Sequence, residues 1–282
     1  MVAVANGGGR YSGGGGGSRH SRRTCSGTGS ARRAAAPPPP PPALLEEVER
    51  LLCSCDSWQF DTFNLQEVSG GHALSVLGFY LLQREGLLER FRAEPLRMAR
   101  LLRTLEAGYP ATNPYHNSAH AADVLHTLHV LLHGARLTEH YLDELGLMAA
   151  YFAAIVHDYG HPGLTNDFLV ATSHPLALRY NDRAPLESHH AAAAFTLLAD
   201  RPDLDVTAGL IAAERAAFRK QVLELVLATD MKQHFAVLNQ FNTVHRLAGK
   251  VDSGSGSGGV GGSATFNGKG DNGNAAAAAG SA

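Results

Sequence analysis

Histidine and acidic side chains gather at four places along this chain of 282 residues, at 115–120, 157–161, 187–190 and 229–230. The first two groups read Tyr-His-Asn-Ser-Ala-His and His-Asp-Tyr-Gly-His, and the third reads Glu-Ser-His-His. Imidazole and carboxylate donate lone pairs to divalent metals near neutral pH, because neither must first lose a proton as a weak acid. The four groups therefore favour a metal centre that carries out hydrolysis.

The first group contains two histidines four residues apart, His116 and His120. On a helix this spacing places both side chains on one face, about one turn apart. Asn113 and Pro114 just upstream are typical of a helix entry, which would leave His116 near an exposed helix start. An isolated pair of this kind is more often two surface histidines than a site, so its weight comes from the other groups.

The second group follows an apolar stretch at 151–156, which predicts that His157 and Asp158 stand at the end of a buried helix. Burying adjacent ionisable side chains costs free energy unless a partner compensates them, and a metal ion is an economical partner. His161 then begins a turn, and Asn166 is expected to cap the following helix.

The third and fourth groups are ambiguous one at a time. Glu187 follows Pro185 and opens a helix that continues through the two histidines at 189 and 190, where an acid commonly serves only the helix dipole. Thr229 and Asp230 follow an apolar run and could form only a helix break with its cap. The argument for chemistry rests on the order of all four groups.

Helical periodicity positions these groups throughout the central part of the chain. Apolar residues follow spacings of three and four in several stripes, of which two are Leu74, Leu77, Leu81, Leu82 and Leu96, Ala99, Leu102, Leu105. Glycine and proline fall between the stripes, and no alternating stretch indicates a strand. The pattern predicts an all-α fold, a compact bundle of eight to eleven short helices.

Both ends of the chain have low-complexity sequence. Residues 1–43 are rich in glycine, serine and arginine and end in a proline run, and residues 249–282 are rich in glycine, serine and alanine. Neither segment can bury enough apolar surface to offset its ordering entropy, so we expect both to be disordered. One folded domain is expected over 44–248.

Composition restricts partners and location. A formal net charge of -2 argues against nucleic acid as the main partner, and no apolar run is long enough to span a bilayer. Three cysteines, none near the histidine groups, favour a reduced, cytoplasmic protein. Organellar targeting by the arginine-rich first 43 residues stays open as the alternative.

The groups together resemble the signatures of the class I 3′,5′-cyclic nucleotide phosphodiesterase catalytic domain. The matching segments are Tyr-His-Asn-x-x-His-Ala-x-Asp-Val from 115, His-Asp-x-x-His-Pro-Gly-x-x-Asn from 157, Tyr-Asn-Asp from 180 and Leu-Ala-Thr-Asp-Met from 227. The similarity covers about 44–245 with the motifs in consistent order. It implies an all-helical metallohydrolase fold of the HD type.

The resemblance implies two divalent ions, zinc and a second ion that is magnesium or manganese. The expected zinc ligands are His120, His157 and Asp158, with Asp158 also bridging to the second ion. Three further residues are expected around that second ion, mostly through its waters: His161, Glu187 and Thr229.

By the same resemblance, hydroxide formed at the ions attacks the phosphorus of cAMP or cGMP and opens the ring to a 5′-monophosphate. His116 is expected to protonate the departing 3′ oxygen as general acid. Tyr115, Asn181 and Asp230 are expected to bind substrate or to surround the site.

The chain also departs from the family pattern. A further metal-binding aspartate and a purine-binding glutamine, expected well after Thr229-Asp230, have no counterpart, and neither Asp252 nor Asp271 has the surrounding motif. The resembled domain would therefore be C-terminally incomplete, with a homodimer or regulatory domains left open for a longer product. The alternative is a catalytically inactive or regulatory remnant of this fold.

Overall fold

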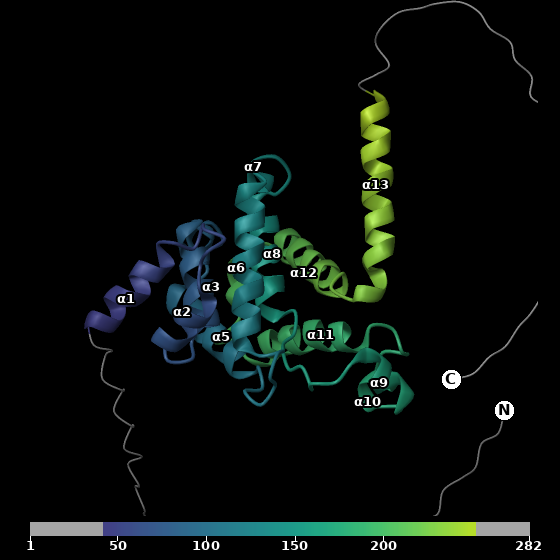
Figure 1. Ribbon diagram of the computed structural model, residues 1–282, viewed down its shortest axis with the longest axis horizontal. Helices are drawn as coiled ribbons and strands as arrows, with labels where there is room; N and C mark the ends of the chain where they lie inside the picture. Colours follow the sequence, from purple (N-terminus) through teal and green to yellow (C-terminus); the bar gives the residue numbers. More distant parts are fainter. Residues whose placement is uncertain (1–41, 252–282) are drawn as a thin grey trace, which may run out of the picture. The chain divides into compact units, whose positions relative to one another are not determined.

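The computed structural model describes the backbone of residues 42–251 and the side chains of 43–243. Within this part the chain forms thirteen α-helices and two short 3-10 helices and no strand, which confirms the all-α prediction (Figure 1). The helices outnumber the predicted eight to eleven because several are single turns of four to six residues that periodicity does not detect. The expected disordered segments 1–43 and 249–282 lie almost wholly outside the described residues.

In chain order the elements are α1 (Pro42–Leu52), α2 (Thr62–Val68), α3 (Ala73–Arg84), α4 (Leu87–Arg90), α5 (Pro95–Ala107), α6 (Ser118–Gly134), α7 (Leu137–His140), α8 (Glu144–Val156), α9 (Asn166–Ala171), α10 (Pro175–Arg179), α11 (Pro185–Asp200), η1 (Val206–Gly209), α12 (Ala212–Leu227), η2 (Met231–Gln233) and α13 (His234–Val251).

Helix α8 is the centre of the fold. Every residue from Gly146 to Val156 is buried, since α6 packs along one side of α8 and α12 along another (Figure 1). Four alanines on α8 allow these neighbours to approach closely: Ala149, Ala150, Ala153 and Ala154. Asp143 starts the helix, because its carboxylate accepts a hydrogen bond of 2.7 Å from the Gly146 amide.

The two apolar stripes have different outcomes. All four leucines of the α3 stripe are buried, at 2% exposure or less, as predicted. The α5 stripe is wrong in part, because Leu96 is 55% exposed whereas Met98 and Leu101 are buried beside Leu102. A repeat of exactly three residues drifts by about 60° per step around a helix of 3.6 residues per turn, so it cannot stay on one face.

The described chain ends in two helices with exposed apolar side chains. On α12, Val222 and Val226 are buried but Leu225 and Leu227 are partly exposed. On α13, whose main contact is with η2, residues 234–243 are exposed. Among the described residues, no helix has both the length and the apolarity that crossing a bilayer requires.

Candidate metal centre

The end of α8 delivers the first two predicted ligands. The helix stops at Val156, and Gly160, at a φ of 71°, lets the chain turn in the left-handed region that favours glycine. The backbone amide of His161 donates to the Asp158 carbonyl at 3.1 Å and closes this turn. His157 and Asp158 therefore lie directly after the buried part of α8, as predicted.

The start of α6 delivers His120. Asn117 caps this helix, since its side-chain oxygen accepts hydrogen bonds from the amides of Ala119 at 3.0 Å and His120 at 3.2 Å. His116 precedes the cap and is not helical, so the prediction that both histidines share one helix face is wrong. Asn117 itself is extended and the chain before it bends, which places the His116 ring 6.0 Å from the His120 ring.

Helix α11 delivers Glu187 and His190 after a turn in which Asn181, Asp182 and Ala184 all have positive φ. The expected cap at Asn166 is wrong, because Thr165 caps α9 instead. The Asn166 amide group donates to both Glu187 carboxylate oxygens, at 2.9 and 3.2 Å, and its oxygen accepts from the Leu186 amide. Asn166 thus fixes the carboxylate at the start of α11.

Three imidazole nitrogens face the Asp158 carboxylate. The Nε2 atoms of His157 and His120 lie 3.3 and 3.5 Å from Oδ2, and 3.4 Å from one another. On the other side, His190 Nε2 lies 3.7 Å from Oδ1. Asp158 belongs to two groups whose candidate ligand atoms lie within 4.8 Å, one with His120 and His157 and one with His161 and His190.

The tautomers explain why this arrangement suits a cation. His157 Nδ1 lies 2.9 Å from the Ala154 carbonyl and His190 Nδ1 lies 2.8 Å from the Tyr159 carbonyl, so each donates its ring proton there. In the neutral form of each ring, Nε2 is then unprotonated and its lone pair points at the Asp158 carboxylate. Lone pairs facing lone pairs are unfavourable without a proton or a metal between them, and the donor set of imidazole and carboxylate fits zinc.

The pKa values follow from burial and from these contacts. Burial lowers the pKa of His190 to about 3 and that of His161 to about 4, with neighbouring histidines adding to the effect on His161, so both are neutral near pH 7. His161 Nδ1 accepts a hydrogen bond of 2.9 Å from the Gly163 amide, so its neutral ring carries the proton on Nε2. Burial opposes ionisation of Asp158, but with no metal present a proton on His157 Nε2 takes the metal's place, and its hydrogen bond and charge outweigh burial and lower the carboxyl pKa. They raise the pKa of His157 for the same reason. Burial raises the pKa of Glu187, against the hydrogen bond from Asn166.

Comparison with known proteins identifies the family. The family model described as 3'5'-cyclic nucleotide phosphodiesterase matches residues 115–257, about half of the chain. The chain belongs to the 3'5'-cyclic nucleotide phosphodiesterase family. It is 41% identical over 189 residues to the human dual specificity calcium/calmodulin-dependent 3',5'-cyclic nucleotide phosphodiesterase 1C, an alignment of 67% of this chain and 26% of the relative.

Two other relatives give similar values. The chain is 43% identical to the probable 3',5'-cyclic-AMP phosphodiesterase pde-4 of Caenorhabditis elegans, over 67% of this chain and 28% of the relative. It is 39% identical to the 3',5'-cyclic-AMP phosphodiesterase 4C of Rattus norvegicus, over 71% of this chain and 37% of the relative. The chain therefore spans about a quarter to two fifths of the length of these relatives.

The other predicted residues of this phosphodiesterase-family chain lie at different places around the cluster. The ring of His116 stacks on that of His161 at 3.9 Å, and Tyr115 lies 4.5 Å from the His120 ring. Asp230 is buried and caps η2 through the Lys232 amide. Within 42–251 no described side-chain contact ties Asn181 to the cluster.

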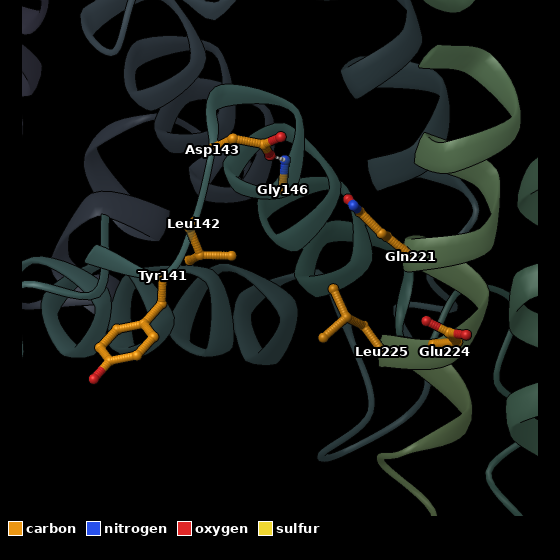
Figure 2. A pocket seen from close by; sticks show the side chains of 7 residues that line it. All are labelled: Tyr141, Leu142, Asp143, Gly146, Gln221, Glu224 and Leu225. Atoms are coloured by element: carbon orange, nitrogen blue, oxygen red, sulfur yellow. Dashed lines mark hydrogen bonds between the residues drawn. The ribbon is translucent and has the colours of Figure 1, made fainter. Parts of the chain in front are cut away.

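Two of the hollows in the described part of the chain touch α8 and α12, and one of these two adjoins the cluster. A space of about 180 Å³ between α6, α8 and α12 is lined mostly by apolar side chains and ends at His157 and Thr229. The larger hollow, about 540 Å³, lies at the start of α8 and contains none of the predicted site residues. Figure 2 shows its side chains, from Tyr141 and Asp143 across to Gln221 and Glu224. Of the two, the smaller hollow is therefore the one that adjoins the predicted metal ligands.

His190 is the residue that sequence reasoning left out of the predicted site. It stands three residues after Glu187 in the Glu-Ser-His-His group, and on a helix that offset places both side chains on neighbouring positions of one face. The same spacing argument that selected His116 and His120 therefore could have selected His190.

Proposed function

We propose that this chain carries the metal-binding and proton-donating part of an enzyme that hydrolyses 3',5'-cyclic nucleotides to 5'-monophosphates. The observation that carries the proposal is the convergence of His120, His157 and His190 on the Asp158 carboxylate, with two tautomers fixed by backbone carbonyls. Family membership supplies the reaction class.

Each residue has a part in holding the ions. His120, His157 and Asp158 suit zinc, which prefers nitrogen ligands together with a carboxylate. The second oxygen of Asp158, Oδ1, with Glu187 on α11 and Thr229 after α12, suits magnesium or manganese, which prefer oxygen. When bound, such a pair of ions lowers the pKa of water and polarises the phosphate.

His116 is proposed as the general acid. Its ring is half-buried and packs face to face on the His161 ring, with the Tyr115 and His120 rings at about right angles to it at 5.0 and 6.0 Å. The Asn113 side chain donates to the carbonyls of both His116 and His161, at 3.1 and 2.9 Å, and so holds the two segments together. This contact positions an imidazole beside the cluster without making it a metal ligand.

Turnover of cAMP and cGMP by the full 282-residue chain tests the proposal, with zinc and magnesium or manganese supplied. Hydrolysis that requires added metal and is lost in Asp158→Asn supports it. His116→Ala should lower turnover by about 100-fold or more while metal content stays unchanged. Equal turnover by His116→Ala and the unmodified chain would contradict the general-acid role.

A second candidate, a non-catalytic metal-binding member of the family, is favoured by one observation. Within residues 42–251, Asp158 is the only carboxylate in the two candidate ligand groups around it. Stoichiometric zinc without hydrolysis of either nucleotide would support this second function over the first. A homodimer and regulatory domains stay predictions.

A further inference from the structure

A second cluster of ligand-type side chains lies away from the phosphodiesterase centre, at the other end of α6. It contains Cys55 and Asp56 from the turn after α1, Glu85 at the end of α3, and His129 on α6. His129 stands nine residues after His120, about 13 Å further along the helix axis. Nothing in the proposed hydrolysis uses these side chains.

The four side chains surround one positive group, the guanidinium of Arg84. Arg84 Nη1 donates to Cys55 Sγ at 3.1 Å, and Nη2 donates to Asp56 Oδ1 at 2.7 Å and to Glu85 Oε1 at 3.3 Å. His129 Nε2 lies 3.0 Å from the same Nη2 atom. The guanidinium therefore occupies the place of a cation among one sulfur, one nitrogen and two carboxylate oxygens.

The guanidinium does not satisfy all the hydrogen-bonding groups of this cluster, as His129 shows. Its Nε2 atom lies 3.0 Å from a donor, Arg84 Nη2, and 2.8 Å from an acceptor, Asp56 Oδ1, and one protonation state can satisfy only one of them. On the far side of the ring, the hydroxyl of the buried Tyr151 lies 2.7 Å from Nδ1. If Nδ1 donates to Tyr151, Nε2 presents a lone pair, which is how ligand histidines are commonly oriented.

We propose that Cys55, Asp56, Glu85 and His129 form a second site for a divalent cation of the zinc class, which binds when the Arg84 side chain turns out into solvent. Cys55, Asp56 and His129 offer ligand atoms within 4.8 Å of one another, and Glu85 forms a second such group with His129 and His133. Thiolate, imidazole and carboxylate are zinc ligands, and the three of the first group with Glu85 from the second would make up its usual coordination number of four. Arg84 is 29% exposed and Asp56 is 63% exposed, so both can move without unpacking the core. The cation takes the thiolate, and the proton of the Cys55 thiol passes to solvent.

The charges permit this exchange. Two carboxylates share a single guanidinium, and a divalent cation in its place, together with the thiolate that it binds, leaves the net charge of the site unchanged. Burial raises the pKa of the Cys55 thiol to about 11, so the cation must displace the thiol proton when it binds. His133 Nε2, 3.5 Å from Glu85 Oε1, adds a further donor at the edge of the cluster.

Cobalt(II) substitution tests the proposal, because a cysteine thiolate bound to cobalt gives a charge-transfer absorption in the near ultraviolet. The full chain is used with Cys25→Ser and Cys53→Ser, which leaves Cys55 as the only sulfur ligand of its kind. We expect the band in this background and its complete loss when Cys55→Ser is added. The phosphodiesterase centre contains no cysteine and contributes none of it, so cobalt binding without the band overturns the proposal.

Two variants separate a metal site from a structural ion-pair network. Arg84→Gln removes the competing cation and should tighten cobalt binding at this band by about tenfold, whereas Arg90→Gln, on the neighbouring short helix, should leave it unchanged. Asp56→Asn should weaken it by about tenfold or more. Far-ultraviolet circular dichroism confirms that each variant keeps its helices. Unchanged or weaker binding in folded Arg84→Gln would show that the guanidinium does not compete with the cation, which would contradict the proposed exchange.

Discussion

His157 and His190 reach the Asp158 carboxylate from different helices but are prepared in the same way. Each donates its Nδ1 proton to a backbone carbonyl, of Ala154 and of Tyr159 respectively, and each is almost wholly buried. A ring fixed in this way loses little entropy when it binds an ion, and the carbonyl makes its free nitrogen a better donor. The centre is therefore arranged for metal by its backbone as much as by its side chains.

This preparation predicts unequal effects for two adjacent histidines. His190→Ala should lower divalent-metal affinity by about 10- to 100-fold, because it removes one of the nitrogens that face Asp158. His189→Ala is the matched control, since that ring lies against Gly160 and belongs to neither candidate ligand group. Isothermal titration with zinc and manganese measures both. Similar losses of metal affinity in the two variants would show that a general disturbance of α11, and not the loss of the His190 nitrogen, weakens binding.

At the scale of the elements, the residue that begins α6 also positions a predicted metal ligand. Asn117 begins the helix and thereby sets the position of His120, whereas Asp143 begins α8 far from the cluster. Asn117→Ala and Asp143→Ala should each lower the free energy of unfolding by about 1 kcal/mol, as loss of an N-cap does. Only Asn117→Ala should also weaken zinc binding, and Asn117→Asp should restore it. Chemical denaturation measures the free energy of unfolding, and titration measures zinc affinity. Equal zinc affinity in Asn117→Ala and Asp143→Ala would contradict the positioning role of Asn117.

The end of α5 makes a second contact that reaches the centre. A Cβ at Gly108 would lie 2.1 Å from Cε2 of Tyr159, whose carbonyl accepts the His190 proton. Gly108→Ala should therefore destabilise the fold by about 1–3 kcal/mol and weaken metal binding. Gly134→Ala, at the end of α6, meets nothing within 4 Å and should be neutral or stabilising by up to about 1 kcal/mol. Thermal melts compare the two, and an equally stable Gly108→Ala would mean that Tyr159 moves aside freely.

The elements also show what the sequence can and cannot predict. Helical periodicity and proline placement predict the long helices and the position of Glu187 at the start of one. Local pattern does not predict that Thr165, and not Asn166, caps α9. The pattern likewise does not predict that the Asn166 side chain donates to the Glu187 carboxylate instead. Nor does it predict that Glu85 and His129 meet around Arg84, since that meeting depends on the packing of α3 against α6. Contacts between distant segments need the fold.

For the molecule as a whole, Asp158 connects three helices that are far apart in sequence. His120 comes from α6, His157 from the end of α8 and His190 from α11, and each approaches the same carboxylate within 3.7 Å. Without an ion, the hydrogen bond and charge of His157 stabilise the half-buried Asp158 carboxylate against the cost of burial. An ion bound there would tie the three helices in the folded state only.

Metal should consequently stabilise the whole chain against unfolding. An ion that binds the folded state alone contributes about 2.7 kcal/mol at 100 times its Kd, which corresponds to a rise of about 5–10 °C in Tm for a domain of this size. The measurement is a thermal melt with and without zinc, in a Cys55→Ser background so that the second proposed site does not contribute. Asp158→Asn should keep the helical signal and lose the rise, because the remaining imidazoles no longer share a carboxylate. A full rise in that variant would mean that zinc stabilises the chain elsewhere and that Asp158 does not hold the three helices together.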